Sequence, residues 1–206
     1  MKRPLSYVAF TESVKAVQQR MGSRKHYERM ETARGWENAI SKDLAGFIGD
    51  RDSFYLATAN ARGQPYIQHR GGPKGFLKVL DERTLAFADF AGNRQYITVG
   101  NLAENKQAFL FLMDYVNQTR VKIWGTAEVV DDPRLVKQLT DPAYKGKSER
   151  AIRFHVEAFD INCRQHIQLR FTQEEVEALV QPLRDRLAEL EAENKALKRS
   201  GAERTR

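Results

Sequence analysis

The residues best suited to chemistry gather in three short stretches between positions 62 and 125. In the first stretch, Arg70 closes an alternating run typical of a β-strand, and Gly71-Gly72-Pro73-Lys74-Gly75 follows it. Glycine lets backbone amides approach an oxyanion closely, and the arginine guanidinium is a charged fork that suits phosphate. This stretch therefore suits an anion, although a plain glycine-rich loop between strands would look the same.

The second stretch is the polar run Asp89–Gln95, in which Asn93-Arg94-Gln95 stands at the expected start of a helix over residues 93–105. The first amides of a helix and the positive end of its dipole favour anions. The alternative is an ordinary N-cap with an exposed arginine.

The third stretch places Arg120, Lys122 and Trp124 at alternate positions of an expected strand, so that they project from one face. Two cations beside an indole could pin a flat ligand, or form a solvated face with a tryptophan at its end. Together the three stretches favour a ligand that is both anionic and aromatic, such as a phosphorylated flavin.

Other kinds of site find little support. The four histidines show no HxH or HxxxH spacing, so we expect no metal site, and a single cysteine, Cys163, excludes an intramolecular disulfide and a cysteine-based zinc site. No Gly-x-Ser-x-Gly, Gly-x-Gly-x-x-Gly or Walker motif is present.

The bulk composition narrows the class of protein further. The net charge of +7 is spread over both ends of the chain without a nucleic-acid-binding motif, so we expect no specific nucleic-acid partner. No run approaches the roughly 18 apolar residues of a membrane span, and no secretory signal is seen. We expect a cytoplasmic protein that does not enter the membrane.

The elements that must position these residues are mainly strands. Helices are expected at residues 10–21, with Thr11 as N-cap, and 41–50, with Ser41 as N-cap, and a surface arm or short helix at 23–35. Strands are expected at residues 53–60, 65–69, 75–80, 84–88, 107–115, 120–130 and 150–162, the fifth of them buried on both faces. The connections are too short for repeated crossovers, which favours a mainly β barrel with peripheral helices.

A different pattern begins at residue 172. Thr172 and Glu175 form a capping box, and a heptad follows with Val176, Leu183, Leu190 and Leu197 in one register and Val180, Leu187 and Asn194 in the other. Pro182 interrupts it. The helix either pairs with a second copy or packs on its own barrel. We therefore divide the chain into an N-terminal helix and arm (1–40), a barrel (41–170) and a C-terminal helix with a basic tail (171–206).

Four segments together resemble the FMN-binding split barrel of the pyridoxamine 5′-phosphate oxidase-like family. They are Gly63-Gln-Pro-Tyr66 with His69-Arg70, Leu85–Gln95, Asn101-Leu-Ala-Glu-Asn105 and Arg120–Glu128. The resemblance covers roughly residues 46–170, and it implies a homodimer with two FMN sites at the interface.

The resemblance also implies roles for single residues. Arg70 would contact FMN, and the main chain at Gly71 and Gly72 would edge the flavin ring. Asn93-Arg94-Gln95 stands in place of the family's Ser-Arg-Lys motif, so Arg94 would hold the phosphate and Lys74 could supply the missing charge. Arg120 stands where a glutamine of the second subunit is usual, and Gln165 and His166 fall where a late strand passes the ring.

The family's activity carries over less completely. Its Trp-Gly-Gly-x-Arg segment and late Arg-x-His, which hold pyridoxal phosphate, are missing. The resemblance thus implies FMN binding and an FMN-dependent oxidoreductase acting on an unidentified small molecule, with no catalytic residue assigned. A flavin- or haem-binding module without turnover, in storage, sensing or stress response, is the alternative.

Overall fold

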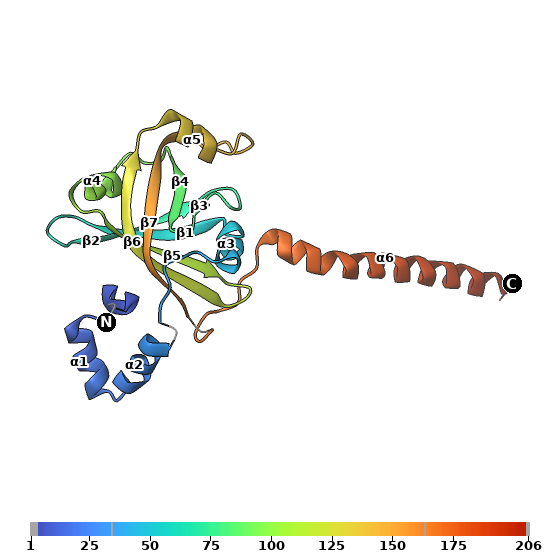
Figure 1. Ribbon diagram of the computed structural model, residues 1–206. Helices are drawn as coiled ribbons and strands as arrows, with labels where there is room; N and C mark the ends of the chain where they lie inside the picture. Colours follow the sequence, from blue (N-terminus) through green and yellow to red (C-terminus); the bar gives the residue numbers. More distant parts are fainter. Residues whose placement is uncertain (1–3, 34, 163, 205–206) are drawn as a thin grey trace.

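Seven antiparallel strands form one curled sheet in the order β2-β1-β5-β6-β7-β4-β3 (Figure 1). This computed structural model describes residues 4–33, 35–162 and 164–204. The strands are β1 (Ser53–Ala59), β2 (Pro65–Gly71), β3 (Lys78–Asp81), β4 (Thr84–Phe90), β5 (Gln107–Asp114), β6 (Thr119–Val130) and β7 (Ser148–Asn162).

The sheet curls far enough for distant strands to share one core. Phe54 of β1 lies 5.1 Å, centroid to centroid, from Phe87 of β4, although three strands separate β1 from β4 in the sheet. Buried leucines and isoleucines of β1, β5, β6 and β7 fill the space between them. The edge strands β2 and β3 do not pair with each other among the described residues. The fold is therefore a split β-barrel, which confirms the fold expected from the sequence.

The longest pairing, β6 with β7, requires a glycine at position 125. The register shifts between Trp124 and Gly125. A Cβ on Gly125 would lie 1.9 Å from the carbonyl oxygen of His155, closer than any side chain can approach. The missing side chain lets β6 bend across β7 and close the barrel.

One strand differs from the expectation of burial on both faces. Along β5, Ala108, Leu110 and Leu112 are buried, whereas the alternate residues Phe109 and Phe111 are only half-buried. The strand therefore turns one face to the core and the other to the outside of the barrel. Its aromatic outer face is part of the second hollow described below.

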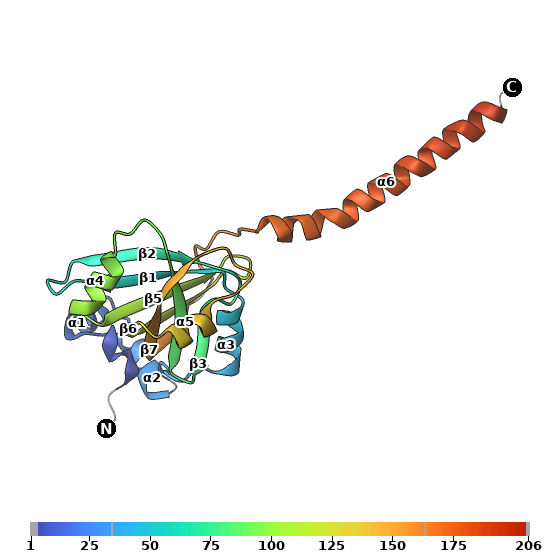
Figure 2. The same ribbon diagram turned by 90° about the horizontal axis from the view of Figure 1, so that it is seen from above.

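All the helices except the last, α6 (Gln173–Arg204), lie around the barrel (Figures 1 and 2). The helices around it are η1 (Leu5–Val8), α1 (Glu12–Arg20), α2 (Arg24–Ala33), α3 (Lys42–Gly49), α4 (Ile97–Glu104) and α5 (Pro133–Leu139). Thr11 and Ser41 cap α1 and α3 as expected, and each accepts a hydrogen bond from the third residue beyond it. The segment expected as an arm or short helix at 23–35 is the helix α2.

The N-terminal segment is held to the barrel by stacked aromatic rings. Trp36 stacks on Trp124 of β6 with ring centroids 4.6 Å apart, and Phe10 packs at a tilt against Trp36 while Phe109 meets Trp124 edge-on. The backbone amide of Phe159 in β7 also donates to the carbonyl of Glu37 at 2.8 Å. Residues 36–37 therefore fasten the segment to the outside of β6 and β7.

The C-terminal helix α6 leaves the barrel and runs away from it (Figures 1 and 2). Its capping box forms as expected, because the Glu175 amide donates to the Thr172 hydroxyl at 3.2 Å and the Thr172 amide donates to the Glu175 carboxylate at 2.7 Å. The helix continues through Pro182. Because α6 runs away from the barrel, the alternative in which this helix packs on its own barrel is wrong. No helix in the described ranges is long and apolar enough to cross a membrane.

Candidate functional site

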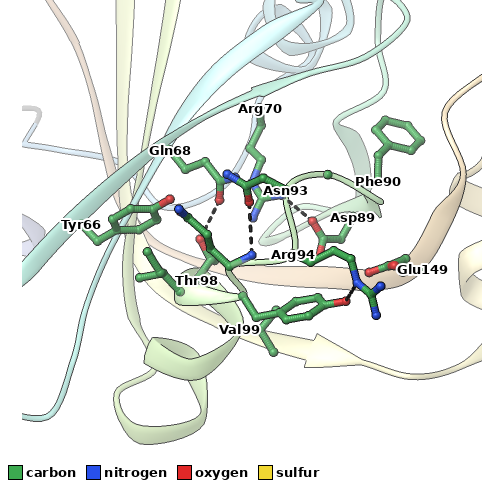
Figure 3. Close-up of a pocket in the computed structure, with 14 residues that line it drawn as sticks. Tyr66, Gln68, Arg70, Asp89, Phe90, Asn93, Arg94, Thr98, Val99 and Glu149 are labelled. Carbon is green, nitrogen blue, oxygen red and sulfur yellow. Dashed lines mark hydrogen bonds and ion pairs between the residues drawn. The ribbon is translucent and has the colours of Figure 1, made fainter.

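A small polar pocket of about 50 Å³ opens between β2, the end of β4, the segment before α4 and the start of β7 (Figure 3). Five residues expected to bind the cofactor line it: Arg70, Asp89, Asn93, Arg94 and Gln95. Arg70 and Arg94 therefore line the same pocket, although they lie on separate elements of the chain.

Strand alternation explains which side chains of β2 reach this pocket. Tyr66, Gln68 and Arg70 occupy every second position and line it, whereas Ile67 lies on the other face of the strand. The Thr98 hydroxyl at the start of α4 donates to the Gln68 side chain at 3.0 Å. This hydrogen bond ties the helix to the strand across the floor of the pocket.

Arg70 is held by an acidic partner. Its guanidinium donates to the Asp89 carboxylate, and Arg150 of β7 approaches the other oxygen of that carboxylate at 3.9 Å. The Nε of Arg70 is buried and lacks a hydrogen-bond partner, the only such side-chain atom in the described part of the chain. A buried donor without an acceptor costs about 1–3 kcal/mol, so this atom marks a place where an anion would be stabilised.

The segment before α4 has an unusual backbone. Arg94 and Tyr96 both adopt left-handed φ angles, 60° and 53°, which are uncommon outside glycine. Asn93 accepts from the Gln95 amide at 3.2 Å, and the Arg94 Nε donates to the Tyr96 hydroxyl at 3.3 Å. This second hydrogen bond raises the pKa of the Arg94 guanidinium above its ordinary value. Strain of this kind is often kept at ligand sites.

The helix expected from residue 93 begins four residues later, at Ile97. Its N-cap is Tyr96, which makes no side-chain cap, and residues 97–99 line the pocket. Ile97 is 39% exposed, while Thr98 and Leu102 are buried. The left-handed residues before Ile97 delay the helix, and they direct its start towards the same anion site.

The glycine-rich segment serves packing instead of supplying free amides. β2 continues through Gly71, which pairs with Ser53, and the Gly72 amide donates to the Asp52 carbonyl at 2.9 Å. A Cβ on Gly72 would lie 2.6 Å from the Phe76 ring. Gly71 lines an adjoining hollow, and Lys74 pairs with Asp50 at 2.8 Å and does not line the pocket.

A second hollow of about 460 Å³ lies on the outer face of β1, β2, β5 and β6. Arg120 and His166 line it, and Gln165 is exposed next to His166. The other lining residues are mostly apolar or aromatic: Tyr55, Ile67, Phe109, Phe111, Met113, Tyr115, Ile167, Gln168 and Arg170. Since Ile67 and Gln68 are neighbours in β2, the two hollows lie on opposite faces of that strand.

The remaining two candidates, Lys122 and Trp124, are occupied by contacts outside the polar pocket. Lys122 pairs with Asp160 at 3.2 Å, and Trp124 is covered by Trp36. Arg120, Lys122 and Trp124 do lie on one face of β6, as expected. They do not form one site, because Arg120 lines the outer hollow and Trp124 stacks on Trp36.

Sequence reasoning missed several residues of the polar pocket. Gln68, Thr98 and Glu149 line it, and Arg150 lies under the Tyr96 ring at 5.1 Å. The alternation Tyr66, Gln68, Arg70 was a usable signal for β2. Nothing in the sequence near Glu149 indicates that β7 would come beside β4. Groups of three or more potential metal ligands are not found among the residues that the structure describes.

Comparison with known proteins agrees with this architecture. Residues 40–178 match the family described as pyridoxamine 5′-phosphate oxidase, and the chain belongs to that family. A comparison with curated protein sequences finds no match.

Several solved structures are similar to this chain at low sequence identity. HupZ of Group A Streptococcus is 18% identical with a TM-score of 0.50, and the match covers 64% of this chain and 99% of that one. An FMN-binding protein from Syntrophomonas wolfei is 14% identical, with a TM-score of 0.44 and coverage of 73% and 97%. HutZ, the heme storage protein from Vibrio cholerae, is 14% identical, with a TM-score of 0.40 and coverage of 60% and 94%.

Proposed function

We propose that this protein binds FMN, with the phosphate in the polar pocket, and acts as an FMN-dependent oxidoreductase on a small molecule. The observation that carries the proposal is that Arg70 and Arg94 line one pocket in a chain of this family. Two guanidinium groups facing one space are suited to a phosphate, because each can donate two charge-assisted hydrogen bonds.

The residues present fit the phosphate of FMN in two respects. The buried Nε of Arg70 has no acceptor in the described part of the chain, and a phosphate oxygen would supply one. The uncapped start of α4 at residues 97–99 adds backbone donors to the same pocket. Against this, Asp89 and Glu149 also line the pocket and offset the charges of the two arginines. Phosphate must therefore compete with Asp89 for Arg70.

The outer hollow supports a homodimer. It exposes apolar side chains that a monomer would normally bury, such as Ile67, which is 62% exposed, and Tyr55, which is 37% exposed. Contiguous apolar surface of this kind is typical of a protein interface. We propose that a second subunit covers it, so that Arg120 and His166 of one subunit reach the ring of the flavin whose phosphate lies in the polar pocket of the other.

In this proposal FMN supplies the electron-transfer chemistry, and the protein binds and tunes it. Arg70 and Arg94 anchor the phosphate, and the Gln68–Thr98 hydrogen bond fixes the floor between them. Arg120 and His166 are the candidates to stabilise negative charge on the pyrimidine edge of the ring. The small-molecule substrate would approach from the open side of the outer hollow.

Titration with FMN, followed by flavin absorbance and fluorescence, tests the proposal. Arg94→Ala should weaken FMN binding about 10- to 100-fold, the range expected when a hydrogen bond between charged groups is lost. Lys74→Ala is the matched control, because it removes one surface cation that pairs with Asp50 outside the pocket. Its affinity should stay at the wild-type value.

A wild-type protein that does not bind added FMN would contradict the proposed function. Equal affinity of the Arg94→Ala and wild-type proteins would remove the polar pocket from the site. If FMN binds, reduction of the bound flavin by NADH or NADPH tests the oxidoreductase part separately.

A second candidate function is haem or flavin binding without turnover, which one observation favours. His166 lies on an aromatic hollow with two arginines, Arg120 and Arg170. Imidazole is a common axial ligand of haem iron, and arginine suits carboxylates such as haem propionates. A haem Soret band that is lost in His166→Ala, together with no response to FMN, would favour this candidate.

A further inference from the structure

The strongest uncovered feature outside these hollows is the apolar stripe of α6. The helix is 32 residues long, or about 48 Å at 1.5 Å per residue. In residues 173–198 every side chain except Val180 is exposed, and the exposed ones include Val176, Leu179, Leu183, Leu187 and Leu190. Helices in proteins owe most of their stability to packing, so a helix of this length and composition needs something to cover it.

We propose that α6 forms a parallel, in-register, two-stranded coiled coil with α6 of a second copy of this chain. The seven-residue spacing of Val176, Leu183 and Leu190 places them at d positions, and Val180 and Leu187 then occupy a positions. Pro182 falls at a c position, so its ring faces away from the partner helix, and the bend that a proline causes lies before the part of the seam that runs from Leu183 to Leu197.

The charges beside the seam are complementary to those of an identical helix. Arg186 at a g position meets Glu191 at the following e position of the partner, and Glu193 meets Lys198 in the same way. Both pairs are opposite in sign. Residues five apart on one helix lie about 140° apart around its axis, so these pairs cannot form within a single chain.

Asn194 favours the parallel arrangement. At an a position it faces Asn194 of the partner in a parallel, in-register pair, where the two side-chain amides can hydrogen-bond. In an antiparallel pair it would face a leucine at a d position, and its amide would be buried without a partner. One buried asparagine of this kind sets register and selects two strands.

The base of α6 lies close to the outer hollow. His166, Gln168 and Arg170 border that hollow, and α6 begins at Gln173. The same second copy can therefore cover both surfaces. The coiled coil does not depend on the proposed function, because the stripe would need covering whether or not FMN binds.

Disulfide trapping in the full-length protein tests the proposal. Leu183→Cys and Leu190→Cys are made separately in a Cys163→Ser background, where the new thiol is the only one in the chain. Both should give interchain disulfides on mild oxidation at low protein concentration, since a disulfide needs Cα atoms within about 7 Å. Ala192→Cys, at an outward f position, is the control and should stay reduced.

The two positions together exclude the antiparallel arrangement. They are seven residues, or about 10 Å, apart, so no antiparallel pair can bring both into contact with their own copies. Failure of either position to cross-link, while the other does, would overturn the parallel proposal. Failure of both would overturn the coiled coil, and FMN titration of the same proteins would show whether the proposed function stands without it.

A charge reversal supplies a second, independent readout. Arg186→Glu should reduce cross-linking of Leu190→Cys at least several-fold, because a carboxylate at this position then faces Glu191 of the partner. Adding Glu191→Arg should restore it. The intrahelical contact of Arg186 with Glu189, 2.8 Å, is not repaired by the second change, so restoration reports the partner helix. No restoration would contradict the predicted pairing.

Discussion

The Asp89 carboxylate accepts a hydrogen bond from the Arg70 guanidinium inside the polar pocket. Both side chains are largely buried, with 8% and 12% of their surface exposed. The contact fixes Arg70 in the pocket, and it also occupies the group that a phosphate would need. Asp89 therefore both positions the anion site and competes with its ligand.

Asp89→Asn should separate these two effects. Loss of the negative charge frees Arg70 for phosphate, so FMN affinity should rise several-fold. The ligand-free protein should lose about 1–3 kcal/mol of stability, because two arginines lose their charged acceptor. FMN titration and denaturant unfolding measure the two changes. Asp160→Asn, which removes the partner of Lys122 outside the pocket, is the control for affinity, and weaker FMN binding by Asp89→Asn would contradict the prediction.

Asp114 should make the stability of the barrel depend on acid. Burial opposes its ionisation, but hydrogen bonds from Asn117 and the nearby Arg51, 3.0 Å away, outweigh burial and hold the pKa of Asp114 below its ordinary value. A carboxyl whose pKa is lower in the folded than in the unfolded chain stabilises the fold above its unfolded pKa of about 3.9. That stabilisation is lost as the pH falls from about 4 through the folded pKa.

Denaturant unfolding between pH 3 and 7 measures this contribution. Asp114→Asn should lower stability at pH 7 and flatten the acid limb of the curve. Asp50, whose pKa is lowered chiefly by its hydrogen bond from Lys74, is a contrast because it is exposed. Its contribution should disappear in high salt, while that of Asp114 persists. An unchanged acid limb in Asp114→Asn would refute the assignment.

Trp36→Ala should release the N-terminal segment from the barrel. The Trp36–Trp124 stack contributes about 0.5–1.5 kcal/mol beyond the area that it buries. Proteolytic cleavage within residues 10–39 should become faster, and the fluorescence of Trp124, then the only tryptophan, should report greater exposure to water. Trp36→Phe keeps a ring in the stack and should protect the segment better than alanine does. Equal cleavage rates for all three proteins would show that the stack does not hold the segment.

Gly125→Ala should prevent the barrel from closing. The new Cβ would meet the His155 carbonyl at 1.9 Å, and backbone cannot move aside as a flexible side chain can. We expect a loss of about 3 kcal/mol or more, the upper end of overpacking effects. Gly100→Ala in α4 is the matched control, since nothing lies within 4 Å of its Cβ and alanine favours a helix by about 0.8–1 kcal/mol. Wild-type stability of Gly125→Ala in thermal unfolding would argue against the bulge.

Much of the fold follows from local patterns in the sequence. The period of two in β7 and β6 predicts strands because it separates buried from exposed side chains over a dozen residues. Thr11, Ser41 and Thr172 predict helix starts because each cap is completed within three residues of chain. Caps and strand alternation depend only on residues within a short segment, so they do not depend on how the rest of the chain folds.

The start of α4 shows where local reasoning fails. Asn93 has the chemistry of an N-cap, and it does accept from the Gln95 amide. The helix nevertheless begins only at Ile97, because Arg94 and Tyr96 adopt left-handed φ angles that do not belong to an α-helix. Likewise the sequence suggests that the Gly72 amide is free to bind a ligand, but in the fold this amide donates a hydrogen bond to the Asp52 carbonyl.

The sequence by itself determined the mainly β architecture, the arginine at the end of β2 and the heptads of α6, since each depends on the order of residues within one element. Only the tertiary structure decided that Arg70 and Arg94 face the same pocket, that Asp89 already binds one of them and that Trp124 lies under Trp36. The first two of these relations depend on how far the sheet curls to bring β2 towards β4. That curl is set by packing over the whole core, which no single segment of the chain determines.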